Sequence, residues 1–384
     1  MSQLNQELND SLPAHIYYDL QISNFDTITQ KPQQFHYNNA NSIAYLQNPE
    51  LYDLAIQKFQ IDTGTAPVFI PSIERNQPDI NKTIYSVTLG VTINDVSYYS
   101  DQIPVMWIPQ DLTADVPVPT NRTDDGFQDN HGGYYFCYSY AWFTNLVNIA
   151  YANALISLIA NTTGIVDADV NPPKIYWENS SASAVLLAQL DYYNLADADH
   201  YSIFMNTALN NLYNSFNATL ETYNSGIGAN YRIYSSQTFG EINVVELPDN
   251  DGNNDFYIKM TQEYSTIMSW APFSAIVFTS NTIPVLPNIV NPTLIYSNNQ
   301  IVSSGSTDTN SESIITDLTS SDGQYRGGMT YVPSAEYRRI TLFGNQPISN
   351  LDLNIYFRTK LGNLVPFRLS SGGSVMLKLG FFKK

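Results

Sequence analysis

The alternation of hydrophobic and polar positions predicts β-strands along most of the chain. In the clearest run, 84–93, apolar side chains occupy every second position from Tyr85 to Ile93, and mostly polar ones lie between them. This is the period of a strand with one buried face. Residues 15–22 show the same alternation. Residues 51–61 fit either a helix or a bulged strand, and the proline-flanked stretch that follows them favours a strand.

Two stretches depart from the strand pattern and place apolar residues at helical spacing. They are residues 139–160 and 199–223, and the first also carries several alanines, which favour helices. Asp197 and Asp199 precede the second stretch as capping candidates, and Gly226 follows it. We therefore expect two amphipathic helices, each packed on the face of a sheet.

The remainder of the chain, from residue 231 onward, predicts short strands separated by turn signals. Their spacing is typical of sandwiches and barrels, and the connector 298–310 is rich in Ser, Asn and Gly. We expect a mainly β body over 1–320, with the helices near 139–160 and 199–223 as insertions. The strands of 321–384 would complete its sheet within one continuous domain. The expected strands lie at 231–234, 241–247, 256–264, 275–280, 293–297 and 313–318.

The composition points toward assembly. Aromatic residues make up 13% of the 384 positions, 28 of them tyrosines, while charged residues make up only 14%. Charged residues are usually about a quarter of a globular chain, and protein interfaces favour Tyr and disfavour Lys and Glu. The net charge of −18 is also uneven, because residues 321–384 hold nine basic and three acidic residues. This predicts an acidic body with a basic C-terminal segment.

Catalytic motifs are not apparent in the sequence. The four histidines lie in unrelated contexts, and the sequence contains no His-Glu-x-x-His pair, phosphate loop, nucleophile elbow or dinucleotide fingerprint. A glycoside hydrolase would need two facing carboxylates, and no short pairing suggests which two. Cys137 stands among aromatic residues, so we expect a buried small side chain rather than a catalytic thiol. The sequence therefore predicts a protein that is not an enzyme.

One acidic loop is a candidate metal site. Its oxygen-bearing side chains occur at alternate positions, as in a calcium loop, and they are Asp249, Asp251, Asn253 and Asp255. A hairpin between 244–245 and 257–258 accounts for the same residues through turn chemistry. Calcium and a plain hairpin turn both stay open at this point, and no other cofactor is expected.

The C-terminal segment carries the most distinctive pattern. Three predicted strands are joined by glycine-marked turns, and the last strand ends in two lysines. This layout resembles the penton or minor capsid proteins of polinton-like viruses, adintoviruses and related small DNA viruses. Three other stretches, 83–89, 138–148 and 275–280, look like the same family. The C-terminal residues that carry the resemblance are Leu351-Asp352-Leu353, Gly362, Val365-Pro366-Phe367, Gly372-Gly373 and the strand from Val375 to Lys384.

The resemblance implies a viral jelly-roll β-sandwich, enlarged by two helical insertions, that belongs to the virion. Such a subunit would assemble with copies of itself, as a pentamer in preference to a trimer, and with a major capsid protein. Because 384 residues is generous for a single jelly roll, a double-jelly-roll major capsid subunit is the alternative. A receptor- or carbohydrate-binding module of the fibre type is another, using Trp177 near Asp167 and Asp169.

The basic C-terminal side chains are the candidate assembly residues. We expect them to face the genome, an inner membrane or an acidic neighbour. Neither a secretory signal nor a run of about twenty apolar residues is apparent, so we expect a soluble product made in the host cell without a signal peptide. The basic candidates are Arg338, Arg339, Arg368, Lys378, Lys383 and Lys384.

Overall fold

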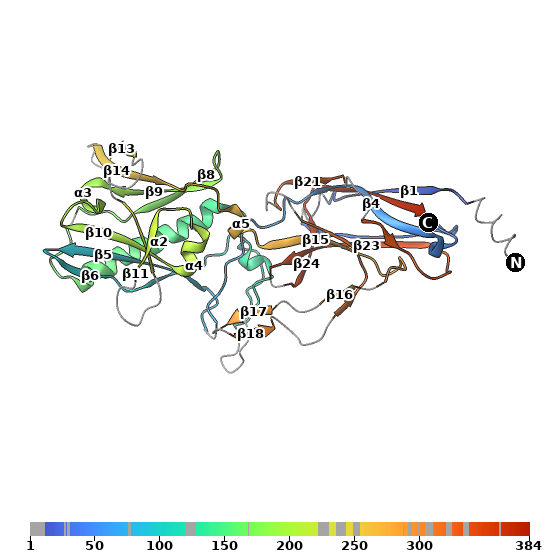
Figure 1. Cartoon of the computed structure of the whole chain (residues 1–384), viewed down its shortest axis with the longest axis horizontal. Coiled ribbons are helices and arrows are strands. Elements are labelled where there is room, and N and C mark those ends of the chain that lie inside the picture. Colours follow the sequence, from blue (N-terminus) through green and yellow to red (C-terminus); the bar gives the residue numbers. More distant parts are fainter. Residues whose placement is uncertain are drawn as a thin grey trace. The chain divides into compact units, whose positions relative to one another are not determined.

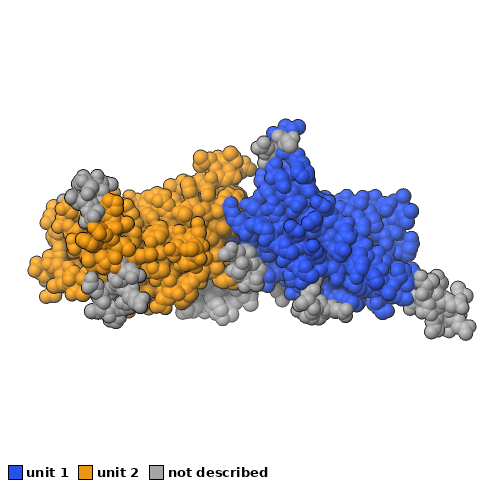
Figure 2. Space-filling view, turned by 90° about the horizontal axis from the view of Figure 1, so that it is seen from above, with its two compact units in different colours: residues 1–66, 272–384 blue, residues 67–271 orange. Residues whose placement is uncertain are grey.

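The chain divides into two compact units, which are coloured separately in Figure 2. Unit 1 comprises residues 1–66 and 272–384, and unit 2 comprises residues 67–271. The expected boundary between 320 and 321 falls inside unit 1, because the segments on both sides of it pair within the same sheets. The computed structural model describes residues 12–26, 28, 31–75, 78–119, 128–167, 169–221, 230–235, 243–248, 254–286, 288–290, 294–297, 300–303, 310–319, 325–332, 338–360 and 362–384.

Unit 1 is a jelly roll built from two antiparallel sheets (Figure 1). One sheet has the order β1-β26-β4-β21 and the other the order β3-β23-β15-β20. Counted along the chain, these strands read 1-8-3-6 and 2-7-4-5, which is the interleaved double Greek key of a jelly roll. Unit 2 enters the sequence between the third and fourth strands. The eight strands are β1 (His15–Ser23), β3 (His36–Ala40), β4 (Tyr52–Asp62), β15 (Phe273–Thr279), β20 (Ile314–Leu318), β21 (Gly328–Tyr331), β23 (Asn350–Thr359) and β26 (Ser374–Lys383).

Shorter elements complete unit 1. β2 (Gln33–Gln34) pairs with β25 (Arg368–Leu369), β22 (Ile340–Thr341) pairs with β4, and β24 (Leu364–Pro366) pairs with β23. The remaining elements are the short helix η1 (Pro49–Leu51) and the paired strands β16 (Asn288–Val290) with β19 (Asn310–Glu312) and β17 (Leu294–Ser297) with β18 (Gln300–Ser303). The expected connector 298–310 therefore contains β18, and its residues 298–299 and 304–309 lie outside the described ranges.

Aromatic side chains join the two sheets of unit 1. The ring of Phe59 on β4 lies 5.3 Å from that of Phe278 on β15, and it stacks on Tyr331 at 5.4 Å. The last strand, β26, pairs with β1 on one side and β4 on the other, and its alternate residues from Val375 to Phe381 are buried. The C-terminal strand is thus a central strand of the sheet, as expected for a terminus that is held in place.

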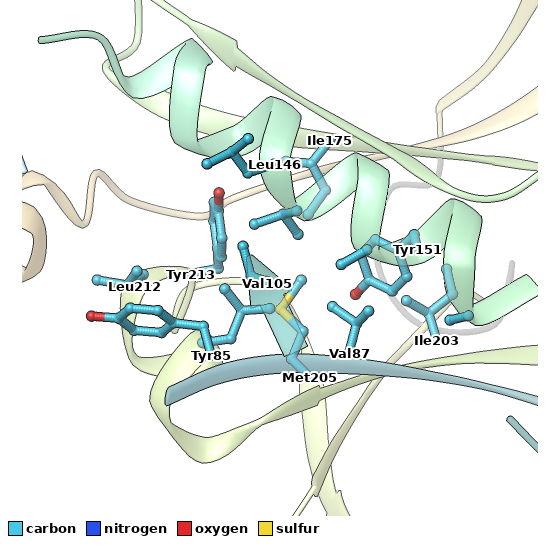
Figure 3. Close-up of a cluster of buried hydrophobic side chains, with 14 of the residues drawn as sticks. Tyr85, Val87, Val105, Leu146, Tyr151, Ile175, Ile203, Met205, Leu212 and Tyr213 are labelled. Carbon is cyan, nitrogen blue, oxygen red and sulfur yellow. The ribbon is translucent and has the colours of Figure 1, made fainter. Parts of the chain in front are cut away.

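Unit 2 is a second sandwich, with helix α2 (Tyr140–Asn161) packed against strands of both of its sheets. One sheet has the order β11-β12-β10-β5-β6, with β7 also paired to β5, and the other has the order β13-β14-β9-β8. Figure 3 shows Leu146 and Tyr151 of α2 among Val87, Val105 and other buried side chains. The strands are β5 (Lys82–Ile93), β6 (Val96–Tyr99), β7 (Ile103–Met106), β8 (Lys174–Glu178), β9 (Ser183–Gln189), β10 (His200–Asn206), β11 (Ala218–Glu221), β12 (Asn230–Ile233), β13 (Asn243–Pro248) and β14 (Asn254–Thr261). The short helices are η2 (Gly133–Tyr135), α3 (Leu190–Tyr193), α4 (Thr207–Leu212) and α5 (Ile267–Trp270).

The expected strands at 15–22, 51–61 and 84–93 are confirmed as β1, β4 and β5, and the helix at 139–160 is confirmed as α2. The second expected helix, 199–223, is wrong: it is the strand β10, the short helix α4 and the strand β11. β10 lies between β5 and β12, and five consecutive residues from Tyr201 to Met205 are buried. A strand covered on both faces loses the alternating pattern, so its apolar run resembles one from a helix.

Helix α2 also corrects the expectation that no long apolar run occurs. By length and composition it is apolar enough to cross a membrane, with a mean hydropathy of 1.4. Half of that stretch is buried inside the protein, as in the core helix of a globular unit. Its buried side chains belong to the hydrophobic core of unit 2.

Candidate assembly surfaces

The basic C-terminal residues do not form one patch. Lys384 lies at the end of β26, where its Nζ donates to Glu50 O at 2.6 Å and to Leu342 O at 3.1 Å. Arg339 lies at the same end, with its guanidinium 4.2 Å from the ring centroid of Phe382. The other end of β26 begins at Ser374, and ten strand residues span roughly 30 Å. Lys383, Lys384 and Arg339 therefore lie at this end of β26, while Arg338, Arg368 and Lys378 lie elsewhere.

Arg338 is held by the strand β20. Its Nη1 donates to Asp317 O at 3.0 Å, and its guanidinium lies 5.4 Å from the ring centroid of Tyr331. Arg358 forms an ion pair with the Asp317 carboxylate at 2.9 Å. Arg368 is exposed on β25 beside β2. Local packing therefore explains part of the positive charge in this segment.

Lys378 lies in a row of charges across the outer face of its sheet. The strand register places Asp19, Lys378 and Lys58 opposite one another on β1, β26 and β4. Lys378 Nζ lies 3.5 Å from Asp19 Oδ1, and the same three residues line a groove with Met376. The row carries two ammonium groups and one carboxylate, so its own net charge is +1 although the chain as a whole is acidic.

The acidic charge is concentrated in unit 2. This unit holds 22 of the 35 acidic residues and 6 of the 17 basic residues, so its formal charge is −16, and unit 1 is left with −2. Residues 321–384 carry +6 and the rest of unit 1 carries −8, so the expected basic C-terminal segment is what brings unit 1 close to neutral.

The candidate calcium loop lies largely outside the described residues. Asp249, Asp251 and Asn253 belong to that part, and Asp255 lies on β14, where its Oδ2 accepts a hydrogen bond from Gln189 Nε2 at 3.2 Å. The flanking strands pair as the hairpin interpretation requires, with Val244 opposite Ile258. Within the described ranges, no group of three or more His, Cys, Asp or Glu side chains could hold a metal ion. A bound calcium ion stays a prediction.

The aromatic side chain that motivated a carbohydrate site is engaged inside unit 2. The Trp177 ring stacks on Tyr140 with centroids 4.3 Å apart and an interplanar angle of 21°. The Trp177 and Trp270 rings lie edge to face, with their centroids 5.7 Å apart. A sugar-binding aromatic ring needs a free face, so this geometry does not favour the fibre-type alternative. Cys137 is fully buried and donates to Ser139 O, as expected for a structural residue.

Two of the segments that carried the family resemblance meet at Asp352. This residue of β23 is 4% exposed, and its carboxylate accepts hydrogen bonds from the hydroxyls of Ser280 and Thr282, at 2.7 Å each, and from the backbone N–H of Asn281. Burial raises the pKa of Asp352, but these hydrogen bonds outweigh it and hold the pKa below its ordinary value. The carboxylate fixes the turn after β15 and is not available for chemistry.

Comparisons with known proteins agree with this architecture. The sequence profile described as Sputnik minor capsid protein V18/19 matches residues 16–383. The chain belongs to this family. It is therefore a structural minor capsid protein of the virion and not an enzyme.

Individual members of the V18/19 family and solved structures extend this result. The chain is 30% identical to "Uncharacterized protein V18" of Sputnik virophage over 154 residues, which cover 38% of this chain and 86% of that protein. It is 24% identical to "Structural protein V19" of Sputnik virophage over 213 residues, covering 54% and 93%. A chain in the 3.5 Å cryo-EM structure of the Sputnik virophage superposes with a TM-score of 0.81 at 23% identity, covering 97% and 99%. The crystal structure of the mavirus penton protein superposes with a TM-score of 0.64 at 14% identity, covering 97% and 100%.

Proposed function

We propose that this protein forms the vertices of an icosahedral capsid as a pentamer that packs beside a major capsid protein. The strand order of unit 1 carries this proposal, since it is a single jelly roll in a chain of the V18/19 family. The mavirus protein that shares the fold is itself named a penton protein. A pentamer is the ring that matches a five-fold vertex, and a closed ring needs heterologous contacts between copies.

A double-jelly-roll major capsid subunit has less support. The described strands of unit 2 form sheets of order β11-β12-β10-β5-β6 and β13-β14-β9-β8, which differ from the paired Greek keys of unit 1. Helix α2 also packs between strands of both sheets. Unit 2 is therefore an insertion of another kind, and a trimer of double jelly rolls is not the favoured assembly.

The distribution of charge favours unit 1 over unit 2 for contacts with anionic partners. Nucleic acid and anionic lipid both repel a unit that carries −16, whereas unit 1 is close to neutral and carries the row with Lys58 and Lys378. We propose that unit 1 supplies any contact with the genome, an inner membrane or an acidic neighbour. Lys378 on the outer face of its sheet and the exposed Arg368 are candidates for this role, whereas Arg338 and Lys384 donate to backbone carbonyl groups of the chain itself.

Electron microscopy of the purified chain, alone and with its major capsid protein, tests the proposal. We expect five-fold rings that enter assembled shells at their vertices. Trimeric capsomers, or shells that exclude the protein, would contradict it. Lys378→Gln with Arg368→Gln should reduce genome content or particle yield, and Lys174→Gln in unit 2 serves as the matched control because Lys174 is an exposed basic residue of the acidic unit.

A further inference from the structure

The outward face of α2 carries apolar side chains and no charge. Residues spaced three or four apart along this helix are exposed, and Leu146 and Tyr151 point into the core from the other side (Figure 3). Ile149, Ile156 and Ile159 are 44%, 65% and 47% exposed. A helix that faces solvent normally carries charged or strongly polar residues on that side. The remaining exposed positions of this face are Ala141, Asn145, Asn153 and Ala160.

Hydrogen bonds fix α2 against the strands on both sides of it. The Asn148 side chain donates to Ile175 O and accepts from Ile175 N, both at 2.7 Å, and so covers the open edge of β8. On the other side, Trp142 Nε1 donates to Ile108 O at 3.0 Å. Ser157 Oγ accepts from Asp101 N at 2.9 Å. The outward face is therefore held rigidly rather than exposed by a loose helix.

The neighbouring segment extends this surface. Ile108 is 44% exposed, and its carbonyl accepts from Trp142 near the N-terminus of α2. We call Ile108, Ile149, Ile156 and Ile159 the α2 wall. At 1.5 Å per residue, the 22 residues of α2 make it about 33 Å long, which is long enough to supply the apolar centre of a standard protein interface.

The α2 wall is uncharged within a strongly acidic unit. No Asp, Glu, Lys or Arg occurs from Asn130 to Val166 or from Gln102 to Gln110, whereas unit 2 as a whole carries −16. Two copies of such a unit repel each other over most of their surfaces. The Asp101 carboxylate, which accepts from Ser157 Oγ at 2.9 Å, borders the wall, and the copies can approach with least repulsion where the facing surfaces carry the fewest carboxylates. An anionic membrane is disfavoured, because interfacial helices usually carry Lys and Arg and this one has none.

We propose that the α2 wall is a contact surface for a second copy of this chain. This inference rests on the proposed function and names a surface through which the copies of a ring would meet. In a heterologous ring the wall would pack on a different, equally uncharged surface of the neighbour. Higher salt screens repulsion between the acidic units, so self-association through the wall strengthens as salt rises.

The test replaces Ile149 and Ile156 with asparagine in the full-length chain. The same helix face already exposes Asn145 and Asn153, so these substitutions suit its solvent-facing geometry. We expect sedimentation velocity to show at least tenfold weaker self-association, with an unchanged thermal midpoint. Ile43→Asn is the matched control, because Ile43 is 73% exposed in unit 1 and should leave association unchanged. Each single variant is measured too, so that a fold defect in the double variant does not decide the result.

Several outcomes would overturn the inference. One is wild-type protein that stays monomeric at all concentrations. A second is a well-folded double variant that associates like wild type. A third is wild-type protein that floats with phosphatidylcholine vesicles while the double variant does not. Incorporation into shells of the major capsid protein separates the two proposals. Wild-type protein that never enters shells contradicts the proposed function, whereas a double variant that forms normal rings and enters shells contradicts only the role of the α2 wall.

Discussion

The Asp352 carboxylate accepts a hydrogen bond from the Ser280 hydroxyl at 2.7 Å, which ties β23 to the turn that follows β15. The two residues are far apart in the sequence, and the strands β15 and β23 pair in the same sheet of the jelly roll. Asn281 and Thr282 donate their backbone N–H groups to the same carboxylate. One buried acidic side chain therefore fixes the conformation of a turn whose own residues are all polar.

Removing this charge should make the stability of the jelly roll less dependent on pH. The pKa of Asp352 is lowered in the folded state, so its contribution is fully present above the ordinary pKa near 4 and is lost as the pH falls through the folded value. We expect Asp352→Asn to cost about 1.5–3 kcal/mol at pH 7, the range for hydrogen bonds to a charged group. Urea unfolding at pH 7 and pH 3 measures the difference, which should shrink at pH 3.

The control for Asp352 is Asp19→Asn. Asp19 forms an exposed ion pair with Lys378, and such pairs contribute at most about 1 kcal/mol. A larger loss for Asp19→Asn than for Asp352→Asn at pH 7 would contradict the role assigned to the buried carboxylate.

The glycine pair in the last turn should respond to alanine for two different reasons. At Gly373 an added Cβ would lie 2.7 Å from Asp62 Oδ2 and 2.8 Å from Ser370 Oγ, so Gly373→Ala should cost about 1–3 kcal/mol through overpacking. Gly372 has open space but a φ of +80°, so Gly372→Ala should cost about 1–2 kcal/mol through backbone strain. Because asparagine tolerates positive φ better than alanine, Gly372→Asn should cost less than Gly372→Ala in thermal unfolding. An equal loss for both Gly372 variants would argue against the backbone explanation.

Asn148 should be essential for the stability of unit 2. Asn148→Leu removes both partners of Ile175 and leaves a strand N–H and C=O unpaired, which should cost about 2–4 kcal/mol. Asn145→Leu, about one turn earlier on the same helix, alters an exposed position and should change stability by less than about 0.5 kcal/mol. Chemical denaturation of the two variants side by side provides the measurement, and similar losses for both would refute the role of Asn148.

The β5–β6 turn offers a stabilising substitution. Asn94 and Asp95 both have positive φ, at 50° and 63°, as a two-residue hairpin turn of the type I′ requires. Asp95→Gly should raise the unfolding free energy by about 0.5–1 kcal/mol, since glycine adopts this conformation without strain. Asp115→Gly, at an exposed residue without positive φ, should lower it or leave it unchanged. A decrease in the melting temperature of Asp95→Gly would contradict the prediction.

Local sequence patterns were sufficient where the residues of an element keep its period. β5 alternates in sequence although residues 85–91 are all buried, because Ser86, Thr88 and Gly90 occupy its second face, and the buried residues of α2 recur at helical spacing. The expected strands on either side of 249–253 also pair, because their register is set by residues close together in the sequence. The stretch 199–223 failed because both buried faces of β10 carry apolar side chains, such as Ile203 and Phe204, so its own residues do not show the period of a strand.

The sequence by itself determined that the chain is mainly β, that its C-terminus is a strand of a sheet, and that its family is one of capsid proteins. Those properties follow from side-chain alternation, turn residues and the layout of motifs, which are all visible in the sequence without knowledge of which segments pair. Only the tertiary structure decided that 67–271 form a separate unit, that this unit holds most of the acidic charge, and that Ile149 and Ile156 face outward while Leu146 and Tyr151 face inward. Whether a side chain is buried depends on strand pairings between segments that are far apart in the sequence. Those pairings exist only in the folded protein.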